Sequence, residues 1–289
     1  MSKTHEFYEI LSYLRKNGKE VSPRGLKCKE IVGYNYVLQP RTRFMNFTQR
    51  KLNLDYIKQE FLWYLRGNRK DISIKHVAKM WDGIINPDGS INSNYGYYIF
   101  NEDSGISNFD RTALNLTRDA DTRRAVICIL DNEHLQSETK DYPCTCYINF
   151  LIRNNKLVMI VRMRSQDAIY GMGNDAPCFS FVHELMYVNL KCLAPKLFAD
   201  LELGLYIHSA DSFHIYEKHY NMLEDIIEEP HIVEIHDSVP EMTINTFENL
   251  TRANKLVGYT TDFSSITDPF ALWMLQRDNP ATLLGTEEL

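Results

Sequence analysis

The sequence lacks a long hydrophobic run and an excess of basic residues. No uninterrupted apolar stretch approaches the roughly 20 residues that a membrane-spanning helix needs, so we expect no membrane partner. Lysine and arginine (32) are outnumbered by aspartate and glutamate (38), which gives a formal net charge of -6. Proteins that bind DNA directly normally carry a basic stripe, so we expect no direct DNA binding. A local arginine cluster still suits a small anion.

The chain also lacks paired cysteines and an apolar signal segment. Its six cysteines show no CxxC spacing, and the residues after Met1 are polar. This pattern indicates free thiols in a reducing cytoplasm, and it gives no reason to expect a metal site. With 289 residues, of which 44% are hydrophobic, the chain is long enough to bury a substantial core without disulfide bonds.

Apolar spacing and turn residues predict a mixed α/β (α+β) fold. We expect a helix over 52–65 that ends at Gly67, and a short strand over 123–130. A hairpin is expected from 144–152 and 156–163, with its turn at 153–155. The remaining expected elements are a buried helix over 177–193, strands over 203–207 and 213–216 interrupted at Asp211-Ser212, and a helix over 216–228.

After Pro230 the sequence has several turn signals and few periodic runs. We therefore predict a catalytic domain over residues 1–230 and a C-terminal extension over 231–289 that packs on it. We find no internal repeat.

Two residues have side chains suited to catalysis, but each also has an ordinary structural interpretation. Cys144 is a strong nucleophile only as a thiolate, whereas most free cysteines are small buried hydrophobes. Glu60 lies in the middle of an apolar helix. It is either solvated at the edge of the apolar stripe or held as a carboxylate in an apolar pocket.

Several motifs appear together in one order. Tyr142-Pro143-Cys144 is followed by Arg164-Ser165-x-Asp167, Gly171 and His214-Ile215-Tyr216. Further upstream lie Glu60–Gly67, Trp81-Asp82, the segment 91–96 and Asp121-Thr122-Arg123-Arg124. This order and spacing resemble the thymidylate synthase superfamily over roughly residues 20 to 228, and several motifs in register are more specific than any one of them.

The resemblance implies a role for each matched residue. Cys144, Glu60 and Asp175 would be catalytic. The substrate would be bound by Arg24, Arg123, Arg124, Arg164, Ser165, Gln166, Asp167, Asp175, His214 and Tyr216. The folate co-substrate, 5,10-methylenetetrahydrofolate, would contact Glu60, Trp81, Tyr95, Asp167 and Gly171. The resemblance also implies a homodimer joined sheet to sheet, in which Arg123 and Arg124 reach the phosphate site of the partner subunit.

Asp175 departs from the synthase pattern and indicates the substrate. Thymidylate synthases place an asparagine here that reads uracil, and an amide both donates and accepts. A carboxylate only accepts, which suits the N4 amino group of cytosine. Thr145 stands where synthases usually have histidine. Both departures resemble the phage deoxycytidylate hydroxymethylases.

That resemblance implies the following reaction on dCMP. The thiolate of Cys144 adds to C6, C5 takes up the one-carbon unit, and water completes 5-hydroxymethyl-dCMP with release of tetrahydrofolate. Four alternatives stay open: a dCMP methylase that uses a hydride from folate, a CMP hydroxymethylase, a dUMP-acting thymidylate synthase or hydroxymethylase, and an inactive regulator that binds nucleotide or RNA.

Overall fold

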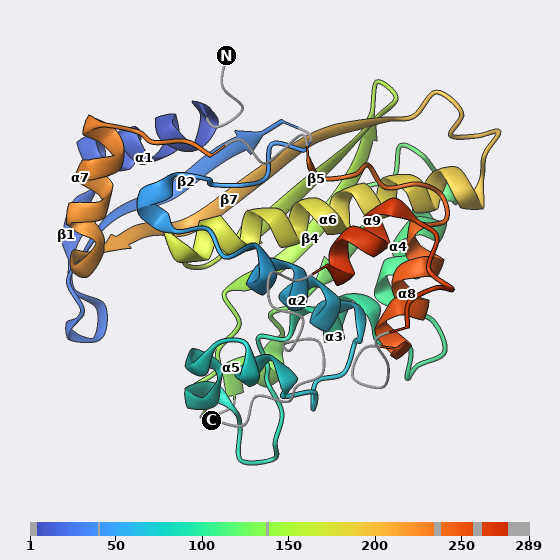
Figure 1. Cartoon of the computed structure of the whole chain (residues 1–289), viewed down its shortest axis with the longest axis horizontal. Helices are drawn as coiled ribbons and strands as arrows, with labels where there is room; N and C mark the ends of the chain where they lie inside the picture. Colours follow the sequence, from blue (N-terminus) through green and yellow to red (C-terminus); the bar gives the residue numbers. More distant parts are fainter. Residues whose placement is uncertain (1–4, 40, 137–138, 234–237, 257–261, 277–289) are drawn as a thin grey trace.

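A mixed β-sheet covered on one face by helices forms the centre of the protein (Figure 1). The structure is a computed structural model that describes residues 5–39, 41–136, 139–233, 238–256 and 262–276. Within these residues the sheet has the strand order β1-β2-β7-β5-β4-β3, and β6 pairs with β7 beside this path. The strands are β1 Lys19–Val21, β2 Cys28–Leu38, β3 Val126–Cys128, β4 Thr145–Arg153, β5 Lys156–Met163, β6 Gln166–Asp167 and β7 Glu202–Tyr216.

The longest described helix, α6 (Tyr170–Leu193), lies along the sheet and is buried over most of its length (Figure 1). The other α-helices are α1 His5–Asn17, α2 Leu54–Leu65, α3 Tyr95–Phe100, α4 Asn108–Arg118, α5 Asn132–Gln136, α7 Tyr220–Glu228, α8 Thr246–Leu256 and α9 Pro269–Leu275. Short 3₁₀ turns, which include η1 (Pro23–Gly25) and η4 (Lys79–Ile84), connect several of them. The core lies between α6 and the sheet.

The structure confirms the helix predicted over 52–65 and the predicted hairpin. Helix α2 begins after Asn53, whose side chain accepts a hydrogen bond from the backbone nitrogen of Tyr56 at 2.9 Å. Strands β4 and β5 pair antiparallel, and Asn154 and Asn155 turn the chain with φ of 52° and 57°. Two left-handed residues are what a tight hairpin turn requires. The short strand predicted over 123–130 is present as β3.

Two predicted boundaries were wrong. Helix α6 begins at Tyr170 rather than Pro177, because Asp167 accepts hydrogen bonds from the backbone nitrogens of Tyr170 and Gly171 and so caps an earlier turn. Strand β7 runs unbroken through Asp211-Ser212, where the sequence predicted an interruption. Ser212 stays paired with β2, and Asp211 forms an ion pair with Arg162 on β5. The following helix, α7, begins at Tyr220.

Helices α8 and α9 were not predicted by the sequence. Both helices are short, so their apolar residues do not form a clear periodic pattern in the sequence. The apolar face of each helix is evident only from its packing against other helices. Phe270 and Trp273 of α9 pack edge-on against Phe181 of α6, with ring centroids 5.3 and 6.1 Å away. Asp268 caps α9 and also accepts the hydroxyl of Thr246 at the start of α8. The segment after 238 therefore belongs to the same hydrophobic core as α2 and α6.

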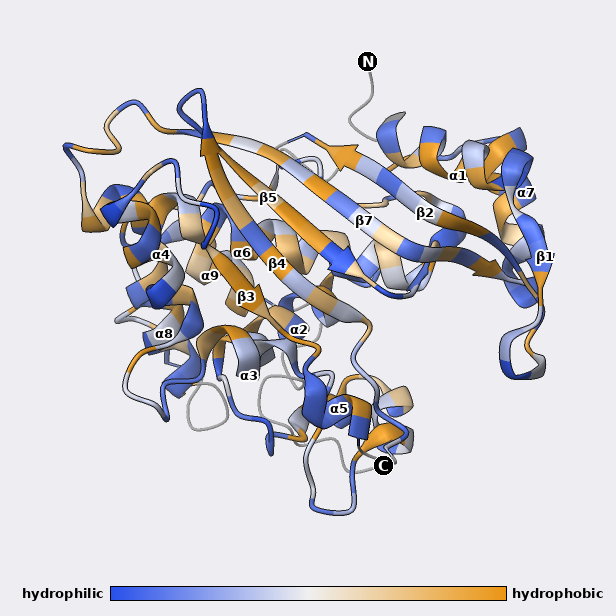
Figure 2. Cartoon of the chain, turned by 180° about the vertical axis from the view of Figure 1, so that it is seen from behind, coloured by the Kyte–Doolittle hydropathy of each residue, from blue (hydrophilic) through white to orange (hydrophobic). Residues whose placement is uncertain are grey.

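On the opposite face of the sheet, none of the helices in the described residues lies over β5, β4 and β7 (Figure 2). Apolar side chains on this face, which include Val37, Tyr147 and Leu205, are 37 to 43% exposed. None of the described helices is long and apolar enough to cross a lipid bilayer. The two faces of the sheet thus differ, since one is covered within the chain and the other is open.

Candidate active site

Cys144 lies at the start of β4, where the chain leaves the segment Asp141-Tyr142-Pro143, and its side chain is half-buried. Ser93 fixes this segment by donating its backbone N–H to Asp141 Oδ2 at 2.9 Å and its hydroxyl to Oδ1. Asn92 also donates to the carbonyl of Asp141 at 2.9 Å. The predicted loop 91–96 therefore holds the segment that precedes Cys144 in place.

Arg164 connects the end of β5 to the thiol. Its guanidinium donates to the carbonyls of Pro143 and Tyr142 at 3.0 and 2.7 Å, and Nη2 lies 3.7 Å from Sγ of Cys144. Burial raises the pKa of Cys144, the positive charge of Arg164 opposes this rise, and Asp175 and Asp141 add to it. In the free protein Cys144 is therefore held mainly as a thiol beside a cation that stabilises the thiolate.

Glu60 is buried, with 5% of its surface exposed, which decides between the two interpretations that the sequence left open. Its Oε1 accepts hydrogen bonds from the hydroxyls of Tyr56 at 3.1 Å and Tyr64 at 3.4 Å, and the thiol of Cys178 points at Oε2. Burial raises the pKa of Glu60 to about 7, although these donors oppose the rise. A carboxyl group with a pKa near neutrality exchanges protons readily in both directions.

Asp175 projects from the second turn of α6 toward the same region. Burial raises its pKa to about 8, and the nearby charge of Glu60 adds to this effect. Gln166 opposes it by donating a hydrogen bond to Oδ2 at 3.3 Å. Asp175 in turn contributes to the raised pKa of Cys144. Asp175 thus lies close enough to both Glu60 and Cys144 to interact with each of them electrostatically.

Residues at the start of α6 form one wall of this region. Asp167 is half-buried and caps the helix through Oδ2, whereas its buried Oδ1 has no hydrogen-bond partner among the described residues. Gly171 lies beside Asp167 and Asp175, and a Cβ there would approach Asp167 Cβ at 3.3 Å. Ser165 is half-buried between β5 and β6. An unpaired acceptor beside a glycine suits a planar ligand that donates N–H groups.

His214 and Tyr216 share one face of β7, with ring centroids 5.0 Å apart. Burial raises the pKa of Tyr216, as do the charges of Asp167 and Cys144, whereas Arg24 lowers it. Arg24 is exposed in η1 and has a left-handed backbone with φ of 55°. Tyr216 therefore lies close enough to Cys144, Asp167 and Arg24 to interact with them electrostatically.

Trp81 and Tyr95 are buried, each with 6% of its surface exposed, so neither offers a ligand much surface to contact directly. Trp81 donates its indole N–H to the hydroxyl of Tyr56 at 3.2 Å, and Tyr56 donates to Glu60. Tyr95 has its pKa raised by burial and by Cys144 and Asp175. Both residues thus reach the site through the buried polar groups that surround it.

Arg123 and Arg124 are not brought to Cys144 within the chain. Both are exposed in the segment that precedes β3, at the edge of the sheet. Their contact with the phosphate site of a partner subunit stays a prediction.

Sequence reasoning missed the buried Arg50 and Tyr36. Arg50 donates to the carbonyl of Ile169 at 2.9 Å and to Oδ1 of Asn174 at 2.7 Å, and burial lowers its pKa to about 10. Gly173 makes room for it, because a Cβ there would lie 2.3 Å from the guanidinium. Tyr36 is bonded to Gln166. An arginine and a tyrosine in otherwise ordinary segments give no sequence signal of burial.

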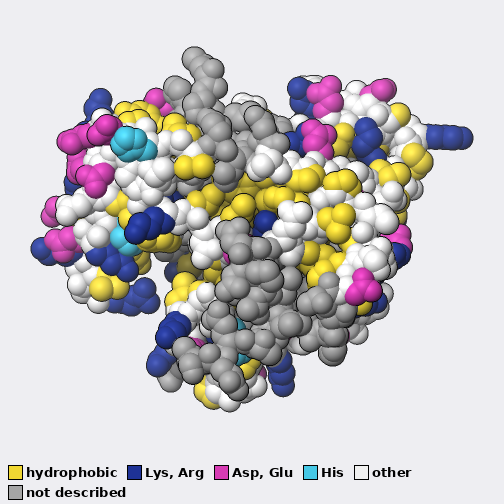
Figure 3. Space-filling view, viewed as in Figure 1, with side chains coloured by type: hydrophobic (Ala, Val, Ile, Leu, Met, Phe, Trp, Pro, Cys, Tyr) yellow, Lys and Arg dark blue, Asp and Glu magenta, His cyan; other side chains and the backbone are white. Residues whose placement is uncertain are grey.

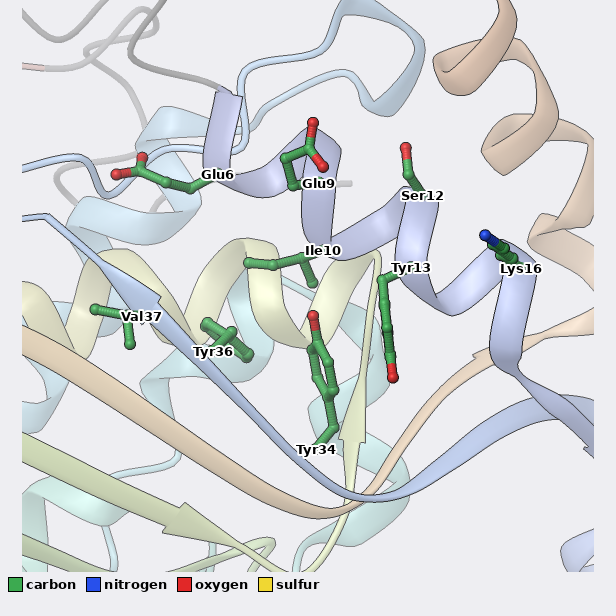
Figure 4. Close-up of a pocket in the computed structure, with 9 residues that line it drawn as sticks. All are labelled: Glu6, Glu9, Ile10, Ser12, Tyr13, Lys16, Tyr34, Tyr36 and Val37. Atoms are coloured by element: carbon green, nitrogen blue, oxygen red, sulfur yellow. The ribbon is translucent and has the colours of Figure 1, made fainter.

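A groove of about 520 Å³ lies elsewhere, between α1 and β2 (Figure 4). Its lining includes Glu9, Tyr13 and Tyr34 and none of the predicted catalytic residues.

On the face shown in Figure 3, the surface is notched between the part formed by β1 and α7 and the part formed by α5. Lysine and arginine side chains lie on both sides of this notch. No group of three potential metal ligands occurs among the described residues.

The two raised carboxyl pKa values predict that stability falls as the pH rises from about 7 to 8.5. In this window the unfolded chain has released both protons, while the folded protein still binds part of them, so ionisation opposes folding. The depressed pKa values of His183 and His208 act below this range. Thermal unfolding midpoints should decrease across the window in the wild type and decrease less in Asp175→Asn. An equal slope in both proteins would contradict the burial of an ionisable Asp175.

Comparison with known proteins agrees with this geometry. The thymidylate synthase family pattern matches residues 5–270. The deoxycytidylate 5-hydroxymethyltransferases of Enterobacteria phages T6 and T4 are each 27% identical over 219 residues, which cover 73% of this chain and 85% of theirs. A deoxyuridylate hydroxymethyltransferase of Bacillus phage SP01 is 30% identical over 273 residues, or 89% of this chain and 68% of the relative. The chain therefore belongs to the thymidylate synthase family.

Proposed function

We propose that the protein is a deoxycytidylate 5-hydroxymethyltransferase, which converts dCMP to 5-hydroxymethyl-dCMP. The observation that carries this proposal is the carboxyl group of Asp175 beside Cys144, at a place where a uracil-reading enzyme needs an amide. Cytosine presents an N4 amino donor, and a carboxyl oxygen accepts from it. The relatives in phages T4 and T6 support the same substrate.

In this reaction Cys144 forms a bond from Sγ to C6 of the pyrimidine, which makes C5 nucleophilic. Arg164 stabilises the thiolate that attacks, since its guanidinium lies 3.7 Å from the sulfur. The one-carbon unit that C5 takes up comes from 5,10-methylenetetrahydrofolate. The unpaired Oδ1 of Asp167, beside Gly171, fits the N–H donors of that molecule. Trp81 and Tyr95 would support this pocket from behind.

Glu60 accepts the proton of the water that becomes the new hydroxyl group. A pKa of about 7 keeps this carboxyl group able to take up and return a proton at neutral pH. Its hydrogen bonds to Tyr56 and Tyr64 fix the direction in which it acts. Before this step, C5 loses its proton to water as tetrahydrofolate departs, which leaves an exocyclic methylene group. Water adds to this group, and the shift of electrons into the ring expels Cys144 from C6 as a thiolate and restores the aromatic ring.

The nucleotide's remaining groups would be bound around this centre. His214 and Tyr216 face the sugar, and Arg24, Arg164 and Ser165 bind the 5′-phosphate through charge-assisted hydrogen bonds. The free thiols fit a reducing cytoplasm, which for a phage protein is that of the host.

A homodimer completes the site in this proposal. The uncovered sheet face carries a row of apolar side chains, and exposed patches of this kind mark interfaces. Two copies joined through this face by a two-fold axis would each present Arg123 and Arg124 to the partner's phosphate site. Their exposed position at the edge of the sheet supports this arrangement.

A second candidate is hydroxymethylation of dUMP. The relative in phage SP01 acts on deoxyuridylate by name, and a protonated Asp175 both donates and accepts, as an asparagine does. With a pKa of about 8, Asp175 is largely protonated at neutral pH when no ligand is bound. Base selection therefore depends on which oxygen of Asp175 carries the proton.

The products of the reaction test the proposed function directly. Incubation with dCMP and 5,10-methylenetetrahydrofolate should give 5-hydroxymethyl-dCMP and tetrahydrofolate, because no hydride is consumed. Cys144→Ser should abolish tritium release from C5 of labelled dCMP, and Cys192→Ser, which changes an exposed cysteine, should retain it. Dihydrofolate together with 5-methyl-dCMP would identify a methylase instead. Equal turnover of CMP and dCMP would show that the protein does not prefer deoxyribose.

Asp175→Asn should shift the preference from dCMP toward dUMP. The amide pairs with N3–H and O4 of uracil and leaves at least one polar group of cytosine unpaired, which costs ~1–3 kcal/mol, or about 5- to 150-fold in the ratio of kcat/KM values. Asp211→Asn, on the far face of the sheet, is the matched control and should keep the wild-type ratio. An unchanged ratio in Asp175→Asn would show that another residue reads the base.

Subunit mixing tests the shared site. Cys144→Ser and the double variant Arg123→Ala/Arg124→Ala should each be inactive or nearly so alone. Equal random mixing makes half of the dimers mixed, and each mixed dimer holds one intact site, so about one quarter of wild-type activity should return. No recovery after verified subunit exchange would place both arginines outside the partner's site.

A further inference from the structure

A buried hydrogen-bonded chain connects three elements of the fold to Asp175. The hydroxyl of Tyr36 on β2 donates to Oε1 of Gln166 on β6 at 3.1 Å. Nε2 of Gln166 then donates to Oδ2 of Asp175 on α6 at 3.3 Å. Tyr36 and Gln166 have only 4% and 2% of their surface exposed, so bulk water does not replace either bond.

This chain fixes the direction of the Gln166 amide. An amide has one end that donates and one that accepts, and a buried end without a partner costs about 1–3 kcal/mol. The Tyr36 hydroxyl satisfies Oε1, which leaves Nε2 to face Asp175. The reversed amide would place Oε1 against an acidic oxygen and would be tolerated only where that oxygen carried a proton.

Tyr36 itself is held by a second buried pair. Its ring stacks on that of His208 at a centroid distance of 4.8 Å and an interplanar angle of 5°, and the two residues are direct partners in the pairing of β2 with β7. Nδ1 of His208 is 2.7 Å from the hydroxyl of Tyr206. Burial lowers the pKa of His208 to about 3, so this ring stays neutral. The tyrosine hydroxyl therefore has a fixed position.

The consequence is an asymmetric carboxyl group. Because Oδ2 accepts from Gln166, a proton on Asp175 resides on Oδ1. Cytosine accepts at N3 and donates at N4, whereas uracil donates at N3 and accepts at O4. A carboxyl group whose proton is confined to one oxygen matches one of these patterns, whereas one whose proton moves freely between both oxygens matches either.

We propose that Tyr36 and Gln166 are positioning residues that confine the proton of Asp175 to Oδ1 and thereby restrict the site to one pyrimidine. This inference rests on the proposed role of Asp175 in reading the base. It assigns selectivity to two residues that lie behind Asp175.

The carboxyl titration of Asp175 tests the proposal without any substrate. It can be followed by ¹³C NMR of labelled aspartate side chains, with Asp175→Asn identifying the signal. Gln166→Leu removes the donor and should raise the pKa of Asp175 by about one pH unit. Tyr36→Phe frees the amide to turn and should raise it by less. Tyr8→Phe removes a hydroxyl group that donates to the carbonyl of Ile227, outside this chain, and should leave it unchanged.

The other titratable groups that face Asp175 stay the same in all of these proteins. They are Glu60 and Tyr64 from α2, Tyr95 from α3, Cys144 before β4, Asp167 from β6, Cys178 from α6 and Tyr206 from β7. An unchanged titration of Asp175 in both Gln166→Leu and Tyr36→Phe would overturn the proposal, whichever reaction the protein catalyses.

Base discrimination provides the second readout. The ratio of kcat/KM for dCMP over dUMP should fall about tenfold in Gln166→Leu and in Tyr36→Phe, and the double variant should fall no further, because Tyr36 acts through Gln166. Thermal unfolding midpoints show whether each variant is folded. Additive losses in the double variant, or an equal loss in Tyr8→Phe, would overturn the inference. A wild type that discriminates in favour of dUMP would contradict the proposed function alone.

Discussion

The burial of two carboxyl groups between α2 and α6 is the constraint on which the site depends. An ionised carboxylate in an apolar interior is costly, so the protein keeps both groups near their neutral form and surrounds them with donors. Tyr56, Tyr64 and Cys178 face Glu60, and Gln166 faces Asp175. The elements that supply these donors must keep their relative positions for the hydrogen bonds to form. The need for donors accounts for the hydroxyl groups in the core beneath the site.

Helix α6 connects the buried carboxyl groups to the rest of the fold. Its start is fixed by Asp167 and Arg50, and its far half carries Glu184, which is buried and paired with Arg43 and Arg41. Glu184 also accepts the backbone nitrogen of Met242, at the beginning of the segment that leads to α8 and α9. The C-terminal helices thus support the same helix that presents Asp175, so the residues after 238 are linked to the position of the active site.

The two faces of the sheet have different surroundings. The face toward α6 carries a buried polar cluster formed by Tyr36, Tyr206 and His208. Gln166, which donates to Asp175, joins this cluster through the hydroxyl of Tyr36. On the opposite face no described helix lies over β5, β4 and β7, and apolar side chains such as Leu205 are partly exposed there.

The sequence by itself indicated the family and the local elements whose signals are short in range, and it predicted Cys144 as the nucleophile. The helix that carries Glu60 and the hairpin after Cys144 follow from apolar spacing and the Asn154-Asn155 turn. Tertiary structure decided everything that depends on burial. A mid-helix glutamate is equally compatible with solvent or an apolar pocket, and only the packing of α2 against α6 shows that Glu60 is buried. The continuity of β7, the early start of α6, the short helices α8 and α9, and the chain from Tyr36 to Asp175 all arise from contacts between distant residues, which local sequence patterns do not encode.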